Sequence, residues 1–339
     1  MIKLLDCGLV CLLVSIIGRR HAVVNSSLEK LFSGILKKMI RAIGKSLWRF
    51  TTPFLKHLIT GRPTPTLSGY KITHRCNLKC LHCPYWKRVG GESDFEGVKR
   101  TLGLLRDMGV KILILEGGEP ILWMDGARGI ADVIDHARGL FPSVCMTTNG
   151  TLPYGDLALD RVWVSLDGTE EIHDRVRGHG VFSKVWKNLE TEGKRNSFIS
   201  FTISRMNRST VSDLLRILKG RVAGVTVQFY YPYSGLPDPL FITAAERGPI
   251  LDELMQLKKE GYPVANSFSS LTDMKKTRWK CSDELLANAE PDGSVNRGCY
   301  LKNRGPSVCE MCGFSAHNEI SLAFNGNIES IMTGMKIFF

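Results

Sequence analysis

The chain of 339 residues lacks several features that would place it in a common class of protein. Its longest apolar run, Cys7 to Ile17, covers 11 positions, whereas a membrane-spanning helix needs about 20. No clear small-residue cleavage motif follows this run, which argues against a cleaved export signal. The chain also has no internal repeat and no low-complexity tract, which excludes solenoid and fibrous architectures.

The net charge of +12 at pH 7 would be compatible with nucleic-acid binding. Most of the chain, however, has no large excess of basic residues. Residues 1–62 contain 11 Lys or Arg and 2 Asp or Glu, a net of +9, which leaves +3 for the other 277 of the 339 residues. The positive charge therefore belongs to the N-terminus, and we predict no nucleic-acid partner.

The basic N-terminal segment has the pattern of an amphipathic helix. Apolar residues recur at helical spacing from Leu28 to Phe50, lysines and arginines fill the other face, and Trp48 lies near the end. This pattern is typical of a helix that lies on an anionic membrane, and also of a helix packed on a folded domain. We predict that residues 1–62 hold a cytoplasmic protein to the cytoplasmic face of the membrane, peripherally or by shallow insertion.

Three of the ten cysteines stand close together in one polar loop. Cys76, Cys80 and Cys83 have the spacing Cys-x3-Cys-x2-Cys and follow a predicted strand, Gly69–Thr73. Three thiolates occupy three corners of a four-iron cluster and leave the fourth iron free to bind a small molecule. A structural zinc site would need a fourth ligand, for which only two histidines stand nearby in the loop.

This loop resembles the signature of the radical S-adenosylmethionine (radical SAM) superfamily. In that family the amine and carboxylate of S-adenosylmethionine (SAM) occupy the open iron, and an electron from the cluster cleaves the cofactor to methionine and a 5′-deoxyadenosyl radical. The resemblance implies a [4Fe–4S] cluster on Cys76, Cys80 and Cys83, SAM as the cofactor, and a flavodoxin- or ferredoxin-type electron donor. His82 departs from the aromatic residue that family members often have before the third cysteine.

Motifs at the ends of later predicted strands resemble the cofactor-binding elements of the same family. One strand ends in Gly-Gly-Glu-Pro, where glycines let the backbone approach a ligand, and the next ends in Thr-Asn-Gly. A third is followed by Asp-Gly and His-Asp-x-x-Arg-Gly, whose arginine suits a carboxylate. Each motif alone is also a common turn. The resemblance implies that the cofactor is bound by Gly117, Gly118, Glu119, Pro120, Asn149, Ser165, Asp167, Arg177 and Asn207.

Strand and helix patterns alternate along the middle of the chain. The predicted strands are 69–73, 111–115, 144–148, 162–166, 198–204 and 225–229, and the predicted helices are 95–108, 127–140, 182–192, 211–218 and 244–260. We predict an α/β fold, a partial (βα)6 TIM-like barrel whose site lies at the C-terminal ends of its strands. An aromatic cluster, Tyr230–Tyr233, follows the sixth strand.

A second set of cysteines lies near the C-terminus, at Cys281, Cys299, Cys309 and Cys312. Their arrangement resembles the twitch or SPASM extensions of radical SAM enzymes, which carry auxiliary iron–sulfur clusters. Four thiolates can close one auxiliary [4Fe–4S] cluster, and structural zinc is the alternative. We predict three parts: a basic amphipathic segment at 1–62, the barrel at 63–265, and a cysteine-rich extension at 266–339.

The sequence leaves the substrate open. No disulfide is needed, and low-potential clusters require reducing surroundings, so we expect an anaerobic cytoplasm around the catalytic part. A membrane-held radical enzyme would gain from a substrate at the interface, so our first hypothesis is a membrane lipid or isoprenoid. The alternatives are a peptide-modifying enzyme, a tetrapyrrole- or quinone-cofactor biosynthetic enzyme, and a membrane-bound iron–sulfur electron carrier without radical chemistry.

Overall fold

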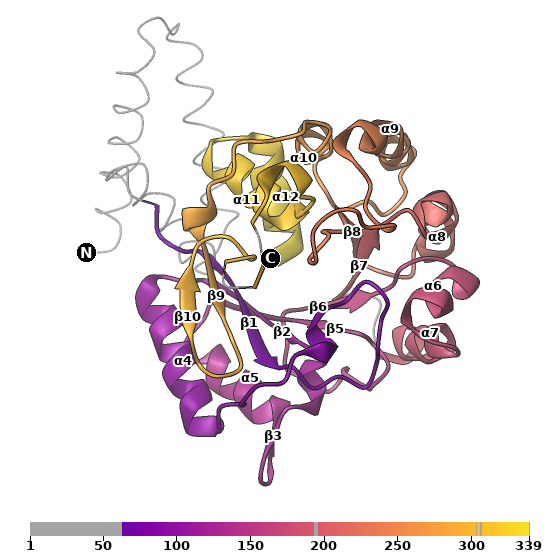
Figure 1. The fold of residues 1–339 in the computed structure, drawn as a ribbon. Helices are drawn as coiled ribbons and strands as arrows, with labels where there is room; N and C mark the ends of the chain where they lie inside the picture. The colour runs from indigo at the N-terminus through magenta and orange to yellow at the C-terminus, as the bar shows by residue number, and fades with distance from the viewer. Residues whose placement is uncertain (1–62, 193–195, 303, 306, 339) are drawn as a thin grey trace, which may run out of the picture. The chain divides into compact units, whose positions relative to one another are not determined.

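A computed structural model describes residues 63–192, 196–302, 304–305 and 307–338 (Figure 1). The predicted membrane-associating segment, residues 1–62, lies outside the described residues. Six parallel strands pair in chain order, as the sequence predicts for a partial barrel. They are β1 (Leu67–Thr73), β2 (Ile112–Gly117), β5 (Ser143–Thr148), β6 (Arg161–Ser165), β7 (Ser197–Ile203) and β8 (Gly224–Phe229).

Helices cover the outer face of this sheet (Figure 1). They are α4 (Phe95–Met108), α5 (Ile130–Arg138), α6 (Glu170–Arg177), α7 (Val181–Glu192), α8 (Val211–Leu218) and α9 (Ala244–Lys259). Outward-facing strand residues such as Tyr70 and Ile72 are fully buried in one core with residues of α4 such as Leu102. Asp94 caps α4 by accepting a hydrogen bond from the Gly97 amide, and Gly109 ends it with a φ of 105°.

Two details of the predicted helices need correction. The helix predicted at 127–140 begins only at residue 130, because a short hairpin of β3 (Met124–Asp125) and β4 (Arg128–Gly129) occupies the residues before it. Helix α6 was not predicted, since its eight residues are too few to show a clear helical period in the sequence. This short helix carries His173 and Arg177, so it decides where both side chains point.

The sheet continues beyond the predicted boundary at residue 265. Strand β9 (Leu286–Ala289) pairs in parallel with β1, and β10 (Val295–Arg297) pairs antiparallel with β9, which makes a sheet of eight strands. Three helices complete this part: α10 (Phe268–Asp273), α11 (Ser315–Phe324) and α12 (Ile328–Phe338). None of the helices in the described part of the chain is long and apolar enough to cross a membrane.

The inner face of the sheet encloses a polar lumen. Residues that point away from the outer helices stay partly accessible, while their neighbours on each strand are buried. The polar residues of this kind are Thr147, Ser165, Ser200, Thr202, Thr226 and Gln228. At the other end of the strands, Ile337 of α12 packs against Trp163 and Phe198, and its carbonyl accepts a hydrogen bond of 2.6 Å from Arg161 Nε. Accessible polar groups therefore concentrate toward the C-terminal strand ends.

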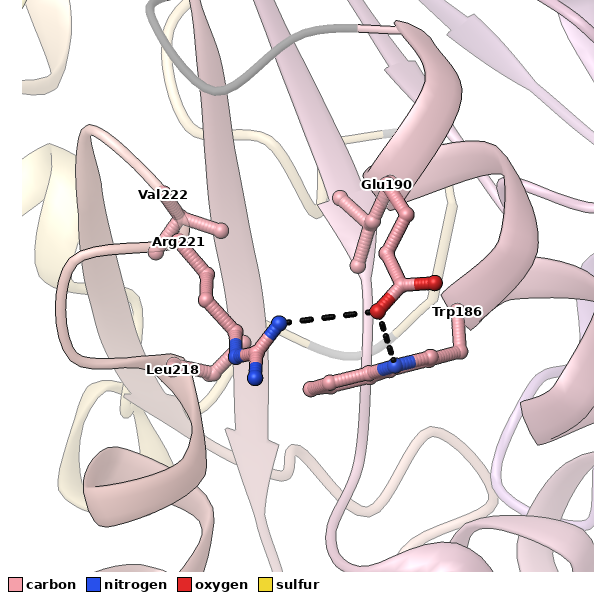
Figure 2. Close-up of a pocket in the computed structure, with 6 residues that line it drawn as sticks. Trp186, Glu190, Leu218, Arg221 and Val222 are labelled. Carbon is pink, nitrogen blue, oxygen red and sulfur yellow. Dashed lines mark hydrogen bonds and ion pairs between the residues drawn. The ribbon is translucent and has the colours of Figure 1, made fainter.

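On the outside of the sheet, a small hollow lies where α7 meets the loop after α8 (Figure 2). The Arg221 guanidinium stacks 5.3 Å from the centre of the Trp186 ring, and Glu190 accepts a hydrogen bond of 3.0 Å from the indole Nε1. Glu190 also pairs with Arg221 at 3.5 Å. These contacts connect α7 to the loop after α8, so we regard the hollow as part of the packing contact between these two elements.

Candidate active site

The three clustered cysteines lie in the loop that follows β1. The amide of Cys83 donates to the carbonyl of Cys80 at 3.2 Å, and the amide of Leu78 lies 3.4 Å from the sulfur of Cys76. The three thiols are close enough to influence one another electrostatically. Burial raises the pKa of the Cys80 thiol to about 11. Bound iron would offset that cost, because cysteine binds metals as the thiolate.

The predicted glycine pair holds this loop in place. A Cβ on Gly117 would lie 2.3 Å from the carbonyl oxygen of Thr73, and one on Gly118 would lie 2.2 Å from that of Arg75. The amides of Gly118 and Glu119 donate to these same two oxygens, at 2.7 and 2.8 Å. The glycines are therefore needed for the close approach of the cysteine loop to β2, in addition to the cofactor contact that the family resemblance implies.

Glu119 links the ends of two strands under the loop. It is fully buried, and it accepts hydrogen bonds of 2.8 Å from the Thr148 hydroxyl and 2.7 Å from the Asn149 amide. The side-chain nitrogen of Asn149 donates to Asn77 at 2.7 Å and lies 3.9 Å from the sulfur of Cys76. Pro120 follows as the buried first residue of a short 3-10 helix. These contacts fix the first cysteine relative to β5.

Arg177 lies beside the second cysteine and forms a buried ion pair. Its Nε is 2.7 Å from Asp167 Oδ2, and its Nη1 is 3.9 Å from the sulfur of Cys80. Burial alone would raise the pKa of Asp167, but the charge of Arg177 outweighs it, so the pKa is lowered. His82 Nε2 is 3.8 Å from the same carboxylate. The Arg177 side chain is buried, so it is not a solvated surface charge.

Asn207, Ser165 and His173 have different surroundings in the structure. Asn207 is buried, and its amide nitrogen donates to the carbonyls of Asp167 and Thr202 at 3.0 and 2.9 Å, so it ties the ends of β6 and β7. Ser165 faces the lumen at the end of β6. His173 Nδ1 accepts a hydrogen bond of 3.1 Å from the Asp167 amide, and burial with the nearby Arg177 charge lowers the pKa of His173 to about 4.

The four C-terminal cysteines all lie in the part of the chain that follows the barrel. Burial raises the pKa values of Cys281 and Cys312 to about 12, and each of these thiols interacts electrostatically with Cys299. Cys281 interacts with Cys309 as well. Among the described residues, no group of three or more His, Cys, Asp or Glu is placed to hold a single metal ion. A donor set of thiolates alone fits the chemistry of an iron–sulfur cluster and of structural zinc.

A buried group of charged and aromatic side chains around Lys71 was not predicted from the sequence. Lys71 of β1 is 2% exposed, and its Nζ lies 3.1 Å from Glu116 Oε1 and 4.0 Å from the centre of the Tyr85 ring. It also donates a hydrogen bond to the hydroxyl of Tyr300, 229 residues away in the chain. Arg304 lies beside this group, paired with Glu116 at 3.6 Å. The sequence signal for this group was Lys71 itself, a charged residue inside an otherwise apolar strand pattern.

Comparison with known proteins agrees with the family that these residues suggest. The sequence model of the Radical SAM superfamily matches residues 70–219. The mycofactocin maturase MftC of Mycobacterium tuberculosis is 31% identical over 300 residues, which cover 82% of this chain and 73% of that protein. The pre-heme d1 synthase of Dinoroseobacter shibae is 30% identical over 181 residues, 49% of this chain and 43% of that protein.

The same fold occurs in solved structures. Streptococcus suis SuiB bound to S-adenosylmethionine superposes with a TM-score of 0.60 at 13% identity, covering 88% of this chain and 77% of SuiB. The chain spans about half the length of two further relatives, an AdoMet-dependent heme synthase and an Fe-coproporphyrin III synthase. The chain belongs to the radical SAM superfamily, whose enzymes use a [4Fe–4S] cluster and SAM. Three thiols in one loop are the kind of donor set that such a cluster takes.

Proposed function

We propose that this chain is a radical SAM enzyme that modifies a peptide. The observation that carries the radical chemistry is the three-cysteine loop, clamped on Gly117 and Gly118 beside the buried Arg177. Two kinds of comparison support a peptide. Relatives aligned over 82% of this chain are named mycofactocin maturases, and SuiB bound to its precursor peptide SuiA shares the fold with a TM-score of 0.56.

A tetrapyrrole is the second candidate substrate, because relatives named for haem biosynthesis align with about half of the chain or more. The lipid hypothesis is weaker than both. It rests on residues 1–62, which lie outside the described part of the chain, and the relatives named above favour peptide or cofactor chemistry. We keep binding of residues 1–62 to the cytoplasmic face of an anionic membrane as a separate proposal about location.

The chain's own residues prepare the site in three ways. Cys76, Cys80 and Cys83 would hold the cluster, and the bound cluster and SAM supply one-electron chemistry that removes a hydrogen atom from the substrate. Arg177 places a positive charge beside Cys80, where it favours the thiolate. The hydroxyl-lined lumen offers hydrogen bonds to bound groups, while the apolar contacts of α12 exclude water at its other end.

The four C-terminal cysteines would hold one auxiliary [4Fe–4S] cluster in a twitch- or SPASM-like extension. The physiological reductant of the enzyme would be a flavodoxin or ferredoxin. Arg247 of α9 supports the last cysteine of this extension, because its guanidinium donates to the carbonyls of Met311 and Cys312.

The test is anaerobic reconstitution followed by reduction in the presence of SAM. We expect about eight irons per chain, as two four-iron clusters, and release of 5′-deoxyadenosine. Replacing Cys76, Cys80 and Cys83 by Ala should remove half of the iron and all cleavage. Replacing the four C-terminal cysteines should remove only the other half of the iron. Cleavage that survives the first variant contradicts the site, and zinc in the natively purified second site contradicts the auxiliary cluster.

A further inference from the structure

The loop that carries the three clustered cysteines is positively charged. Residues 74–91 contain four Lys or Arg and no Asp or Glu. Arg75 is compensated by a residue just outside this stretch, since its guanidinium pairs with Glu92 at 2.8 Å. Arg88 is partly buried and donates a hydrogen bond to the carbonyl of Arg304. The two remaining cations of the loop are exposed lysines.

These two lysines, Lys79 and Lys87, lie beside one tryptophan. Their Nζ atoms are 5.9 and 5.2 Å from the centre of the Trp86 ring. Neither lysine forms an ion pair with a carboxylate of the described residues. A lysine in this position keeps its charge in water while its carbon chain covers apolar surface. The loop therefore shows solvent two uncompensated positive charges around a flat apolar ring.

This lysine–tryptophan face, formed by Lys79, Trp86 and Lys87, contacts the backbone of the cysteine loop directly. The indole Nε1 of Trp86 donates a hydrogen bond of 3.2 Å to the carbonyl of Cys80. The same peptide unit leads into Leu81, whose side chain is 62% exposed. An apolar centre within a charged rim is the composition of a protein–protein contact site.

We infer that the lysine–tryptophan face docks a one-electron donor protein with an acidic surface. This inference rests on the proposed function, because the chain needs such a donor only if its cysteine loop holds a cluster that must be reduced. Electron tunnelling slows steeply with distance, so a donor has to come close to the loop. Opposite charges speed and orient that approach, and a small contact releases the donor after each electron.

An anionic membrane is the other partner that lysines beside a tryptophan would fit. Two observations favour the protein. The face is in contact with the backbone of Cys80, which would bind iron, and this proximity serves electron delivery and has no use in membrane binding. The face is also formed by one short loop, whereas attachment to a membrane surface normally uses a longer amphipathic helix.

The experiment measures equilibrium binding of a purified, oxidised flavodoxin with an acidic surface to the full-length, anaerobically reconstituted chain by calorimetry. We expect Lys79→Glu and Lys87→Glu each to weaken binding about fivefold, and added salt to weaken binding by the native chain. Lys219→Glu is the matched control and should leave the affinity unchanged. Lys219 is also exposed and lies 4.4 Å from the centre of the Tyr262 ring, but it precedes β8, at the opposite end of the strands.

Circular dichroism and iron content establish whether each variant is folded and loaded. Where a reversed charge costs iron, Lys79→Gln and Lys87→Gln take its place, with about twofold weaker binding expected. A ferredoxin with an acidic surface is tested in the same way. Binding of neither carrier by the native chain, or an equal loss of affinity in Lys219→Glu, overturns the inference.

Vesicles of phosphatidylserine and phosphatidylcholine test the membrane as the partner. Weaker vesicle binding by Lys79→Glu and Lys87→Glu, with unchanged binding of both carriers, would assign the face to a membrane and overturn the inference. Unchanged vesicle binding with weaker carrier binding supports the donor protein.

Failure of this inference is distinguishable from failure of the proposed function, because dithionite delivers electrons without a docked protein. If the native chain cleaves SAM with dithionite but shows no carrier binding that depends on Lys79 and Lys87, the radical chemistry stands and only the docking face is wrong. A native chain that does not cleave SAM with dithionite contradicts the proposed function itself.

Discussion

At the scale of single residues, the site depends on buried charges whose partners are specific. Asp167 accepts from Arg177 and from the Thr202 amide, while its own backbone amide donates to His173. Each of these groups is shielded from water, so removing one partner leaves another charge uncompensated. The same shielding keeps His173 neutral, since its hydrogen bond uses the ring nitrogen that a proton would occupy.

We predict that Asp167→Asn destabilises the protein by about 3–5 kcal/mol, because Arg177 would remain buried without its carboxylate. Denaturant unfolding followed by tryptophan fluorescence measures the change. Asp213→Asn is the matched control, since Asp213 pairs with the exposed Arg216 at 2.8 Å and should have almost no effect. Similar losses of unfolding free energy in both variants would show that burial of the Asp167–Arg177 ion pair does not contribute to stability.

Stability should also fall as the pH decreases from about 6.5 to about 4, partly because of His173. The pKa of His173 is about 4 in the folded protein, so over this range the unfolded chain binds a proton that the folded chain does not. That difference costs on the order of 3 kcal/mol by pH 4. His173→Gln should flatten the dependence of unfolding free energy on pH, and an unchanged slope would refute the assignment.

At the scale of elements, the cysteine loop takes its shape from the strand end beside it. The Gly117–Gly118 pair lets β2 approach the backbone after β1, and Glu119 then joins β2 to β5. The short helix α6 adds Arg177 from the other side. Three separate connections of the barrel therefore meet at one loop.

Gly118→Ala should disrupt the loop, because the added Cβ would lie 2.2 Å from one backbone oxygen and 2.6 Å from another. Backbone atoms cannot move aside as a flexible side chain can, so we expect loss of iron from the three-cysteine site and loss of SAM cleavage. Gly103→Ala in α4 is the control, since nothing lies within 4 Å of its added Cβ, and it should stabilise the helix by about 0.5–1 kcal/mol. Iron content and unfolding curves of both variants check this.

At the scale of the whole molecule, the C-terminal part completes the barrel as well as carrying the second cysteine set. Strand β9 extends the sheet from β1, and Arg304 and Tyr300 reach the lumen beside Lys71. A change in the second cysteine set can therefore affect this side of the lumen directly.

Removal of residues 1–62 tests the membrane proposal on the whole chain. A protein that starts at Pro63 should keep its iron and still cleave SAM, because the described barrel begins with β1. The full chain should sediment with anionic vesicles at low salt and less so at high salt, since surface charges are screened over about 10 Å at 0.1 M. A full chain that stays free of vesicles at low salt would contradict the proposal.

The sequence determined the elements whose signals are local. Apolar runs ended by polar motifs predicted six parallel strands, and the spacing of three cysteines within eight positions predicted the cluster loop. Each signal is contained in a short window, and chain order then sets the order of the strands. The assignment of Asn149, Ser165 and the other residues to cofactor contact remains a prediction.

Only the tertiary structure decided which distant residues meet. The pairing of β9 with β1 and the contact of Lys71 with Tyr300 join positions more than 200 residues apart, and no local period encodes such contacts. The same holds for Arg177, because a sequence cannot show whether an arginine on an eight-residue helix faces water or a buried aspartate. Burial turns these side chains from solvated charges into paired ones, and burial depends on the packing of the whole chain.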